Sequence, residues 1–209
     1  MNVELVWATP KAEELIGYMA RVSNPNAKQG DDASKLIKYL IDNAHWSPLE
    51  MANLCVKIET TRDISAQIIR HRSFSFQEFS QRYARVSPPE IPHFRRQDNK
   101  NRQNSFDDIP LEVQGELQVK TAKVLAKTYL LYEELLQAGV AKECARKILP
   151  MNSPTTVYMN GTLRSWVHYL KLRCDPATQE EHRYIANKVL NIFYGQFPSV
   201  ARAAHLDSG

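Results

Sequence analysis

Residues 70–83, RHRSFSFQEFSQRY, combine basic, hydroxyl and aromatic side chains within one short stretch. In an extended or turning backbone, Arg70 and Arg72 would project to one side and His71 to the other. Two guanidinium groups on one side suit phosphate or carboxylate groups, because arginine binds these oxyanions in a planar, bidentate way. The stretch therefore predicts an oxyanion-binding clamp with an imidazole behind it.

Other interpretations of the same stretch remain open at this point. Glu78 and Arg82 are four residues apart in the order that favours a helical ion pair, which indicates a solvated, salt-bridged surface. Alternatively, a nucleic-acid-binding module would use the basic aromatic segment 70–102, stacking bases on Phe74, Phe76, Phe79 and Tyr83. Such a module would bind with a steep salt dependence.

Ser80 raises the separate question of a nucleophile. No G-x-S-x-G sequence surrounds it, and no base is paired with it by spacing. A hydroxyl two residues before Arg82 is better suited to hydrogen-bonding a phosphate, which is the role we expect for it.

Positive charge is concentrated in parts of the chain. The formal net charge is only +4, but residues 62–102 hold nine Lys or Arg against four Asp or Glu, a local net charge of +5. A second basic group contains Arg146, Arg164 and Arg173, with His168 on the same helical face as Arg164. Neither a G-x-G-x-x-G nor a Walker loop is present, so a bound nucleotide would need another kind of cradle.

Several classes of protein are disfavoured by the remaining sequence. Cys55, Cys144 and Cys174 are widely separated, and neither they nor the six histidines have metal-ligand spacing, so we expect no disulfide framework and no metal site. The first residues do not have the pattern of a signal peptide, and no apolar run has the length of a membrane span. We expect a cytoplasmic, reduced protein without a membrane partner.

The pattern of apolar residues predicts a mostly helical α+β protein with a single domain over 1–209. Alternation predicts strands, and helical spacing predicts helices. The expected strands are 54–59 and 155–159, the latter followed by a turn at Asn160 and Gly161. The expected helices are 15–22, 36–41, 64–69, 110–139 with Leu117, Val124, Leu131 and Leu135 on its apolar side, 141–149, 162–173, and a last one from Asp175 to Gly195.

Residues 84–108 are polar and proline-rich and show no period. A loop of this length in a compact domain is usually functional or disordered. We expect it to order over or beside a substrate.

Taken together, the motifs resemble those of a known family. The pattern R-H-R, seven residues, S at 70–80 is similar to the signature of the flavin-dependent thymidylate synthases. Four further blocks resemble that family in order and approximate spacing: ARVS at 20–23, HWSPLE at 45–50, ECARKILP at 143–150 and GTLRSWVHYLKLR at 161–173. The resemblance covers nearly the whole chain.

The resemblance implies an FAD-dependent enzyme that methylates dUMP to dTMP, with methylenetetrahydrofolate as one-carbon donor and NADPH as reductant. It also implies a small antiparallel sheet flanked by helices, and a homotetramer with active sites shared between subunits. Nucleic acid is then not an expected partner. A related flavoprotein that oxidises NADPH without making dTMP is a further alternative, which the presence of Arg173 and Ser80 disfavours.

The resemblance also implies roles for individual residues. The FAD-binding positions correspond to Ser47, Arg70, His71, Arg72, Glu78, Thr162, Arg164 and His168. The dUMP-binding positions correspond to Gln67, Arg70, Glu78, Ser80, Arg82, Arg146 and Arg173. Arg173 would also polarise the uracil ring, and His45 would act in one-carbon transfer.

The chain departs from the family pattern at a few positions. Leu49 and Met51 stand where Phe and His are usual, Gln77 stands where Asn is common, and Thr162 stands where some members have Asn. None of the cysteines lies in the Pro-Cys-His setting used by the other class of thymidylate synthase. No cysteine nucleophile is therefore expected.

Overall fold

A four-stranded sheet with the order β1-β2-β6-β3 is the central feature of the computed structural model, which describes residues 1–24, 26 and 32–206. The strands are β1 (Asn2–Ala8), β2 (Asn53–Thr61), β6 (Pro154–Thr162) and β3 (Ser75–Glu78). The amide of Leu163 donates to Ala52 at one end of the β2–β6 pair, and that of Arg62 donates to Ser153 at the other. This order of partners is that of antiparallel strands, as expected.

The chain divides into two compact units. The first contains the described residues of Met1–Ile58, Ile68–Gln77 and Tyr158–Gly209, and the second contains Glu59–Gln67 and Glu78–Val157. The boundary falls within β2, β3 and β6. The expected single domain over 1–209 stays a prediction.

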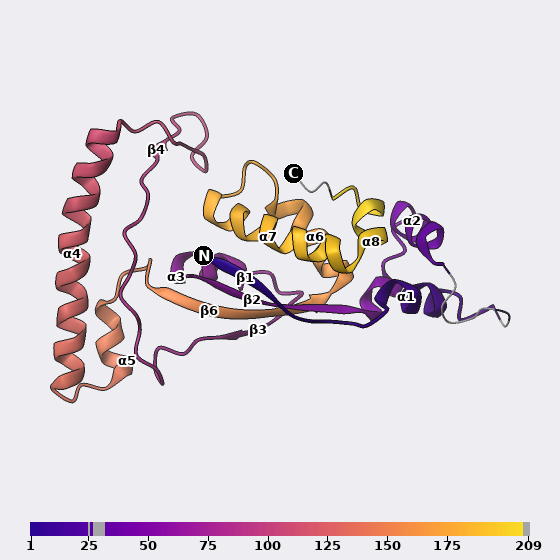
Figure 1. Ribbon diagram of the computed structural model, residues 1–209, viewed down its shortest axis with the longest axis horizontal. Coiled ribbons are helices and arrows are strands. Elements are labelled where there is room, and N and C mark those ends of the chain that lie inside the picture. Colours follow the sequence, from indigo (N-terminus) through magenta and orange to yellow (C-terminus); the bar gives the residue numbers. More distant parts are fainter. Residues whose placement is uncertain (25, 27–31, 207–209) are drawn as a thin grey trace. The chain divides into compact units, whose positions relative to one another are not determined.

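Helices pack around the sheet residues of the first unit. They are α1 (Ala12–Ala20), α2 (Ser34–Asp42), the 3₁₀ helix η1 (Ser47–Met51), α6 (Leu163–Arg173), α7 (Glu180–Gln196) and α8 (Pro198–Ala203). The helices α6 and α7 lie side by side, and α7 packs against β1 (Figure 1). Trp166 on α6 is fully buried and donates its indole N–H to the carbonyl of Leu54 at 2.9 Å, which ties α6 to β2.

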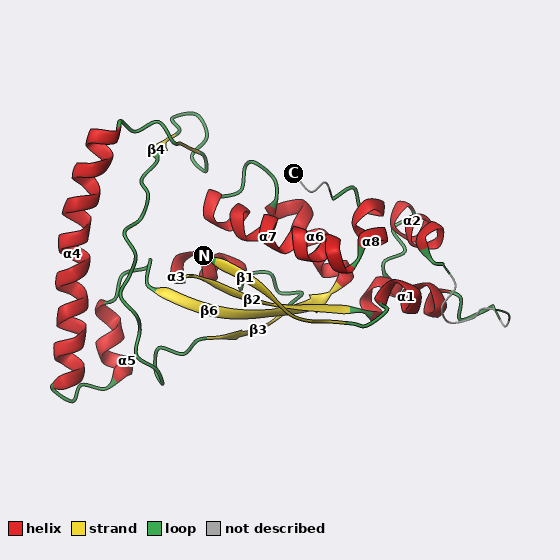
Figure 2. Cartoon of the chain, in the orientation of Figure 1, coloured by secondary structure: helices red, strands yellow, loops and turns green. Residues whose placement is uncertain are grey.

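The second unit has a smaller core. Its elements include most of α3 (Arg62–Ile68), α4 (Leu111–Gln137), α5 (Lys142–Ala145), the 3₁₀ helix η2 (Arg146–Ile148), and the short strands β4 (Arg96–Gln97) and β5 (Ser105–Phe106), which Figure 2 distinguishes from the surrounding loops. Val86, Tyr132 and Ala145 are buried together, and the Tyr132 hydroxyl accepts from the Val86 amide at 3.2 Å.

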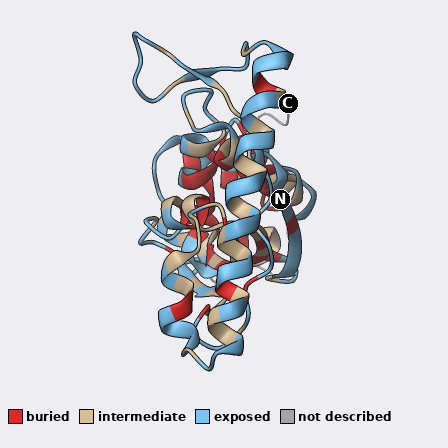
Figure 3. Ribbon diagram, turned by 90° about the vertical axis from the view of Figure 1, so that its left-hand side faces the viewer, coloured by how far each residue is buried: buried red, intermediate tan, exposed pale blue. Residues whose placement is uncertain are grey.

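The long helix α4 buries less than its sequence predicts. Gln114 and Tyr132 are its buried residues, and most of the rest is exposed or half-exposed (Figure 3). Leu135 packs against the core as expected, but Leu117, Val124 and Leu131 are exposed. The apolar period was identified correctly, but most of that face is not covered by any residue that the structure describes. The helix ends as predicted, with Gly139 at φ 83° after its last turn.

Two predicted boundaries are wrong. Asn160 and Gly161 continue β6 instead of forming a turn. The Phe74 ring lies so close to Gly161 that a Cβ on residue 161 would be 2.4 Å from it. Gly161 is needed here for close packing. The last helix begins at Glu180, not at Asp175, whose carboxylate accepts from the Ala177 amide at 2.8 Å in a preceding turn.

The strands β1 and β3, the helix α8 and the β4–β5 pair were not expected. The segment 84–108 therefore contains a short antiparallel hairpin, in which Arg96 pairs with Phe106 and Gln97 with Ser105. Among the described residues, no helix is both long enough and apolar enough to cross a membrane.

Candidate active site

The R-H-R triplet forms a turn after α3. The His71 amide donates to the Ile68 carbonyl at 3.1 Å, and the Phe74 amide donates to the His71 carbonyl at 3.2 Å. Arg70 and Arg72 are exposed and make no hydrogen bond or ion pair with any residue that the structure describes. His71 is half-buried, so the two guanidinium groups remain available to a ligand while the imidazole faces the protein.

His71 contacts the last residue of α6. Arg173 Nε donates to His71 Nε2 at 2.9 Å, across 102 positions of sequence. Burial, and then the charge of Arg173, lowers the pKa of His71 to about 4. The imidazole is therefore neutral near pH 7, and its Nε2 acts as the acceptor.

Two buried side chains stand beside this pair. The ring of Tyr169 is 4.9 Å from that of His71, and the Tyr169 hydroxyl is 3.1 Å from His182 Nε2. His182 has no exposed surface, and burial, followed by the charges of Arg173 and His71, lowers its pKa to about 3. Arg173 is thus the one group of these four that carries a charge near pH 7.

The other predicted residues of α6 lie at its N-terminal end and outer face. Thr162 is the N-cap and accepts from the Ser165 amide at 3.2 Å, which starts the helix. Arg164 is exposed and pairs with Glu50 on η1. His168 lies four residues on, as predicted, with its ring 4.7 Å from that of Trp46.

The block HWSPLE is positioned by the end of α2. Ala44 has φ 55°, an unusual conformation for a residue other than glycine, and the His45 amide donates to the Leu40 carbonyl at 2.7 Å. His45 and Ser47 consequently lie at the surface next to the half-buried Trp46. The ring of His45 is 5.8 Å from that of Tyr39.

A cavity of about 620 Å³ opens beside Ser47. It is lined by residues of two of the family-like blocks and their neighbours: Tyr18, Met19, Arg21, Val22, Asn24, Ser47, Pro48 and Met51. Arg21 donates through Nη2 to the Asp32 carbonyl at 3.3 Å, whereas its Nη1 is shielded from solvent and has no partner among the described residues. The sequence interpretation included ARVS as a block but assigned no role to Arg21.

In the second unit, Glu78 is the centre of a polar cluster. Its Oε1 accepts from Ser65 Oγ at 2.6 Å and from Thr155 Oγ1 at 3.1 Å, and it forms an ion pair with Arg62. Glu78 therefore ends β3 as a largely buried, paired carboxylate. The alternative of a helical ion pair between Glu78 and Arg82 is wrong, because these residues lie in a strand and a turn.

The remaining predicted residues of this unit are more open. Arg82 pairs with Glu143 at 3.3 Å, and both side chains are exposed. Ser80 Oγ accepts from the Arg82 amide at 3.4 Å, while Arg146 begins η2, three residues after Glu143. Gln67 is half-buried on α3. The turn at 80–82 thus provides the Ser80 hydroxyl and the Arg82 guanidinium, and η2 provides the guanidinium of Arg146.

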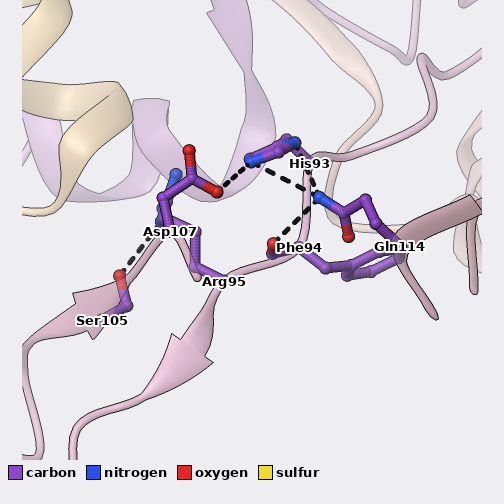
Figure 4. A network of polar contacts seen from close by, with 6 residues as sticks. All are labelled: His93, Phe94, Arg95, Ser105, Asp107 and Gln114. Atoms are coloured by element: carbon purple, nitrogen blue, oxygen red, sulfur yellow. Dashed lines mark hydrogen bonds and ion pairs between the residues drawn. The ribbon is translucent and has the colours of Figure 1, made fainter. Parts of the chain in front are cut away.

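The segment 84–108 is held by a polar network that includes Gln114 of α4 (Figure 4). His93 Nε2 lies 2.6 Å from Asp107, and the side-chain Nε2 of Gln114 donates to His93 Nδ1 at 2.8 Å and to the Phe94 carbonyl at 3.0 Å. Arg96 forms a bidentate pair with Asp108. This network gives the segment a defined conformation; its expected position over or beside a substrate stays a prediction.

Sequence interpretation missed Tyr169 and His182 as neighbours of the site. For both residues, the helical spacing of the apolar positions indicates burial. His182 precedes Ile185 and Val189 by three and seven residues, which places it on the apolar face of α7. A histidine on such a face is buried by packing even though its immediate neighbours are charged.

Comparison with known proteins assigns the family. Residues 4–199 match the family described as "Thymidylate synthase complementing protein". The chain is 51% identical to the probable flavin-dependent thymidylate synthase of Paramecium bursaria Chlorella virus 1, over 92% of this chain and 90% of that protein. It is also 51% identical to the flavin-dependent thymidylate synthase of Synechocystis sp., over 91% of this chain and 88% of that protein. The chain belongs to the flavin-dependent thymidylate synthase family.

The fold agrees with that assignment. The structure resembles PolB from Streptomyces cacaoi, described as a UMP/dUMP methylase bound with 5-Br dUMP, with a TM-score of 0.84, 23% identity, and coverage of 97% of this chain and 93% of that one. The expected α+β fold with a small antiparallel sheet is confirmed. As a member of the flavin-dependent thymidylate synthase family, the protein is an enzyme.

Proposed function

We propose that this enzyme converts dUMP to dTMP by reductive methylation, with methylenetetrahydrofolate as one-carbon donor, NADPH as reductant and FAD as bound cofactor. Family membership and the names of the relatives support the reaction class. The Streptomyces cacaoi methylase is bound with 5-Br dUMP, which supports dUMP as the substrate.

The observation that carries the proposal is the bond between Arg173 and His71. A carboxylate partner would neutralise the guanidinium, whereas the neutral imidazole orients it through Nε and leaves its charge uncompensated. The terminal nitrogens of Arg173, Nη1 and Nη2, form no hydrogen bond with any residue in the described part of the chain. Placed against a uracil carbonyl and N3, they would favour the electron-rich form of the ring and make C5 more nucleophilic.

The phosphate of dUMP is assigned to the open basic residues of the second unit. Ser80, Arg82 and Arg146 provide a hydroxyl and two guanidinium groups, the donor set that a phosphate prefers. Arg70, Gln67 and Glu78 complete the proposed dUMP-binding residues. This set includes residues of both units, and in a homotetramer with shared sites they need not come from the same copy.

The residues of the first unit fit an anionic dinucleotide. Arg70 and Arg72 are exposed and unpaired within the described residues, and Arg21 is among the residues that line the cavity beside Ser47. Ser47, Arg70, His71, Arg72, Thr162, Arg164 and His168 of this unit would hold FAD, together with Glu78 of the second unit, which in a homotetramer need not come from the same copy. The bound flavin would supply hydride transfer, and exposed His45 is assigned to one-carbon transfer.

The environment of two cysteines supports a route without a cysteine nucleophile. Burial raises the pKa of Cys174 to about 11 and also raises that of Cys55. Both thiols are therefore protonated near pH 7, whereas a cysteine nucleophile would have to be a thiolate. Activation of the pyrimidine by Arg173 does not need such a group.

We also propose that the enzyme is a cytoplasmic homotetramer. Leu117, Val124 and Leu131, which share one face of α4, are 38%, 63% and 47% exposed. An apolar face of this length on a soluble protein is typical of a surface that a partner covers, and a second copy would bury it. Sedimentation of the purified protein tests the assembly, and a monomer at micromolar concentration would contradict it.

An absorption experiment tests the function directly. The purified protein should show a flavin band that NADPH bleaches without oxygen, more readily when dUMP is added. With methylenetetrahydrofolate present, dTMP should then form. A protein that neither contains nor takes up FAD would contradict the proposal, and its binding to nucleic acid at several salt concentrations should then be measured.

A further inference from the structure

The buried side chains behind Arg173 have no role in the function proposed above. Tyr169 on α6 and His182 on α7 are 2% and 0% exposed, and both belong to the first unit, as do His71 and Arg173. The ring of His71 lies 4.9 Å from Tyr169 and 6.2 Å from His182, nearly perpendicular to each. Phe74 lies 6.5 Å from His71 and 5.8 Å from Tyr169. His71 is therefore enclosed by aromatic rings on its protein side.

This arrangement is unfavourable for stability alone. Burying two imidazoles beside a guanidinium costs free energy, since apolar side chains of similar volume would fill the same space without desolvated polar groups. The polar atoms are nevertheless connected in two steps: Tyr169 hydroxyl to His182 Nε2 at 3.1 Å, and Arg173 Nε to His71 Nε2 at 2.9 Å. Contact between the Tyr169 and His71 rings joins the two steps.

The direction of the Arg173 bond requires a particular form of His71. Nε2 must carry the lone pair, so the proton of the neutral ring is on Nδ1. If the ring turned by 180°, the Cε1–H would replace Nε2 opposite the guanidinium, and if the ring became protonated, Nε2 would carry a proton; either change would break the bond. The plane of the His71 ring therefore determines whether Arg173 is held.

We infer that His182 and Tyr169 are positioning residues for Arg173. The hydrogen bond to His182 fixes the Tyr169 ring, the Tyr169 ring fixes the plane of His71, and His71 then holds Nε of Arg173 with its terminal nitrogens left for the substrate. The inference rests on the proposed role of Arg173 toward the uracil ring. It adds two residues that do not contact the substrate but determine how well Arg173 is oriented toward it.

The test uses two variants of the buried pair and one matched control. Tyr169→Phe removes the hydroxyl and keeps the ring, and His182→Gln replaces the imidazole by an amide of similar reach. Tyr132→Phe is the control, because Tyr132 is equally buried and its hydroxyl is also hydrogen-bonded, but it lies in the core of the second unit. The affinity for dUMP is measured by calorimetry on the FAD-loaded enzyme, together with the melting temperature.

We expect Tyr169→Phe and His182→Gln each to weaken dUMP binding about tenfold, and Tyr132→Phe to leave it unchanged at a similar loss of melting temperature. On an Arg173→Ala background, Tyr169→Phe should weaken binding less than twofold, because the group that it positions is absent. A merely structural role would instead give the same factor on both backgrounds, and that result would overturn the inference.

Failure of the proposed function would look different. If the unaltered enzyme did not bind dUMP, or if Arg173→Ala bound it equally well, the role of Arg173 would be wrong before the positioning residues were considered. If Arg173→Ala weakens binding and neither Tyr169→Phe nor His182→Gln does, only the positioning role is wrong. Should Tyr169→Phe fail to fold, His182→Gln provides the same comparison on both backgrounds.

Discussion

The two units hold their arginines in different ways. In the first unit, Arg173 is bonded to a neutral imidazole, with a neutral tyrosine and a second neutral imidazole behind it. In the second unit, Arg62 and Arg82 are paired with the carboxylates of Glu78 and Glu143. A carboxylate partner compensates the charge of an arginine, whereas an imidazole partner only orients it. The partner of an arginine is therefore as informative about its function as the arginine itself.

The two regions also differ in how their titratable side chains are charged. Protonation of either imidazole would place a second positive charge near Arg173, and burial prevents this near pH 7 by lowering both pKa values. The Glu78 carboxylate instead pairs with Arg62 and accepts hydrogen bonds from two hydroxyls, so its charge is compensated. The first region preserves an uncompensated charge for a ligand, and the second uses a charge to hold the structure together.

Removing the uncompensated charge should have the largest effect. Arg173→Ala is expected to lower the rate of dTMP formation by about a thousandfold, the upper range for loss of one charge-stabilising donor. FAD absorbance should be retained. Arg173→Lys should lose nearly as much, because lysine has no Nε–H to donate to His71. Turnover equal to that of the unaltered enzyme would remove Arg173 from the chemistry.

Acid should destabilise the first region through its histidines. The pKa values of His71 and His182 are about 4 and about 3 in the folded chain, below the ordinary value of about 6.5 in an unfolded chain. From about pH 6.5 down to about 4, the unfolded state therefore binds more protons, and the free energy of unfolding falls as the pH falls.

His182→Gln should reduce that pH dependence by up to about 1.4 kcal/mol per pH unit, the value for one proton. Urea unfolding at pH 7.5, 6, 5 and 4.5 measures the slope. Tyr132→Phe should retain the slope of the unaltered protein. Equal slopes for His182→Gln and the unaltered protein would show that His182 is not kept neutral by the fold.

The compensated carboxylate should contribute to stability even when no ligand is bound. Glu78→Gln removes the ion pair with Arg62 and weakens the bonds from Ser65 and Thr155, so we expect a loss of about 2 kcal/mol in the free energy of unfolding, typical of hydrogen bonds to a charged group. Chemical denaturation at pH 7.5 measures it. An unchanged stability would mean that this cluster does not hold β3 in place.

The smallest effect is expected at the exposed pair of the second unit. Arg82 and Glu143 are both exposed, so Glu143→Gln should change the free energy of unfolding by less than about 0.5 kcal/mol. It should also free Arg82 for the phosphate of dUMP and tighten dUMP binding by a few-fold. Weaker binding would indicate that Glu143 orients Arg82 instead of competing for it.

Local patterns in the sequence predicted much of the secondary structure. The helices of 12–20, 34–42, 111–137 and 163–173 and the strand of 53–61 were expected within a few residues. Two short or irregular features were not. The strand β3 follows the R-H-R turn with only four residues, and the β4–β5 pair has two residues on each side, so neither is long enough to show a period.

The predicted site residues were brought together only in part. Within the first unit, His71 and Arg173 are directly bonded, and Thr162, Arg164 and His168 share one helix. Within the second unit, Ser80 and Arg82 share a turn, but Glu78 turned out to pair with Arg62 and Thr155. The spacing along the chain identified the groups capable of chemistry without identifying the partner of each.

The sequence alone thus determined the kinds of group present and the local elements that carry them: guanidinium groups at 70, 72 and 173, a histidine between the first two, and a helix that ends at Arg173. These follow from residue type and from a period of a few residues. Only the tertiary structure decided that His71 is the partner of Arg173, 102 positions away, and that His182 lies behind them. Such pairings depend on the strand order β1-β2-β6-β3 and on the packing of α6 and α7. Because they are long-range contacts, no short window of sequence contains them.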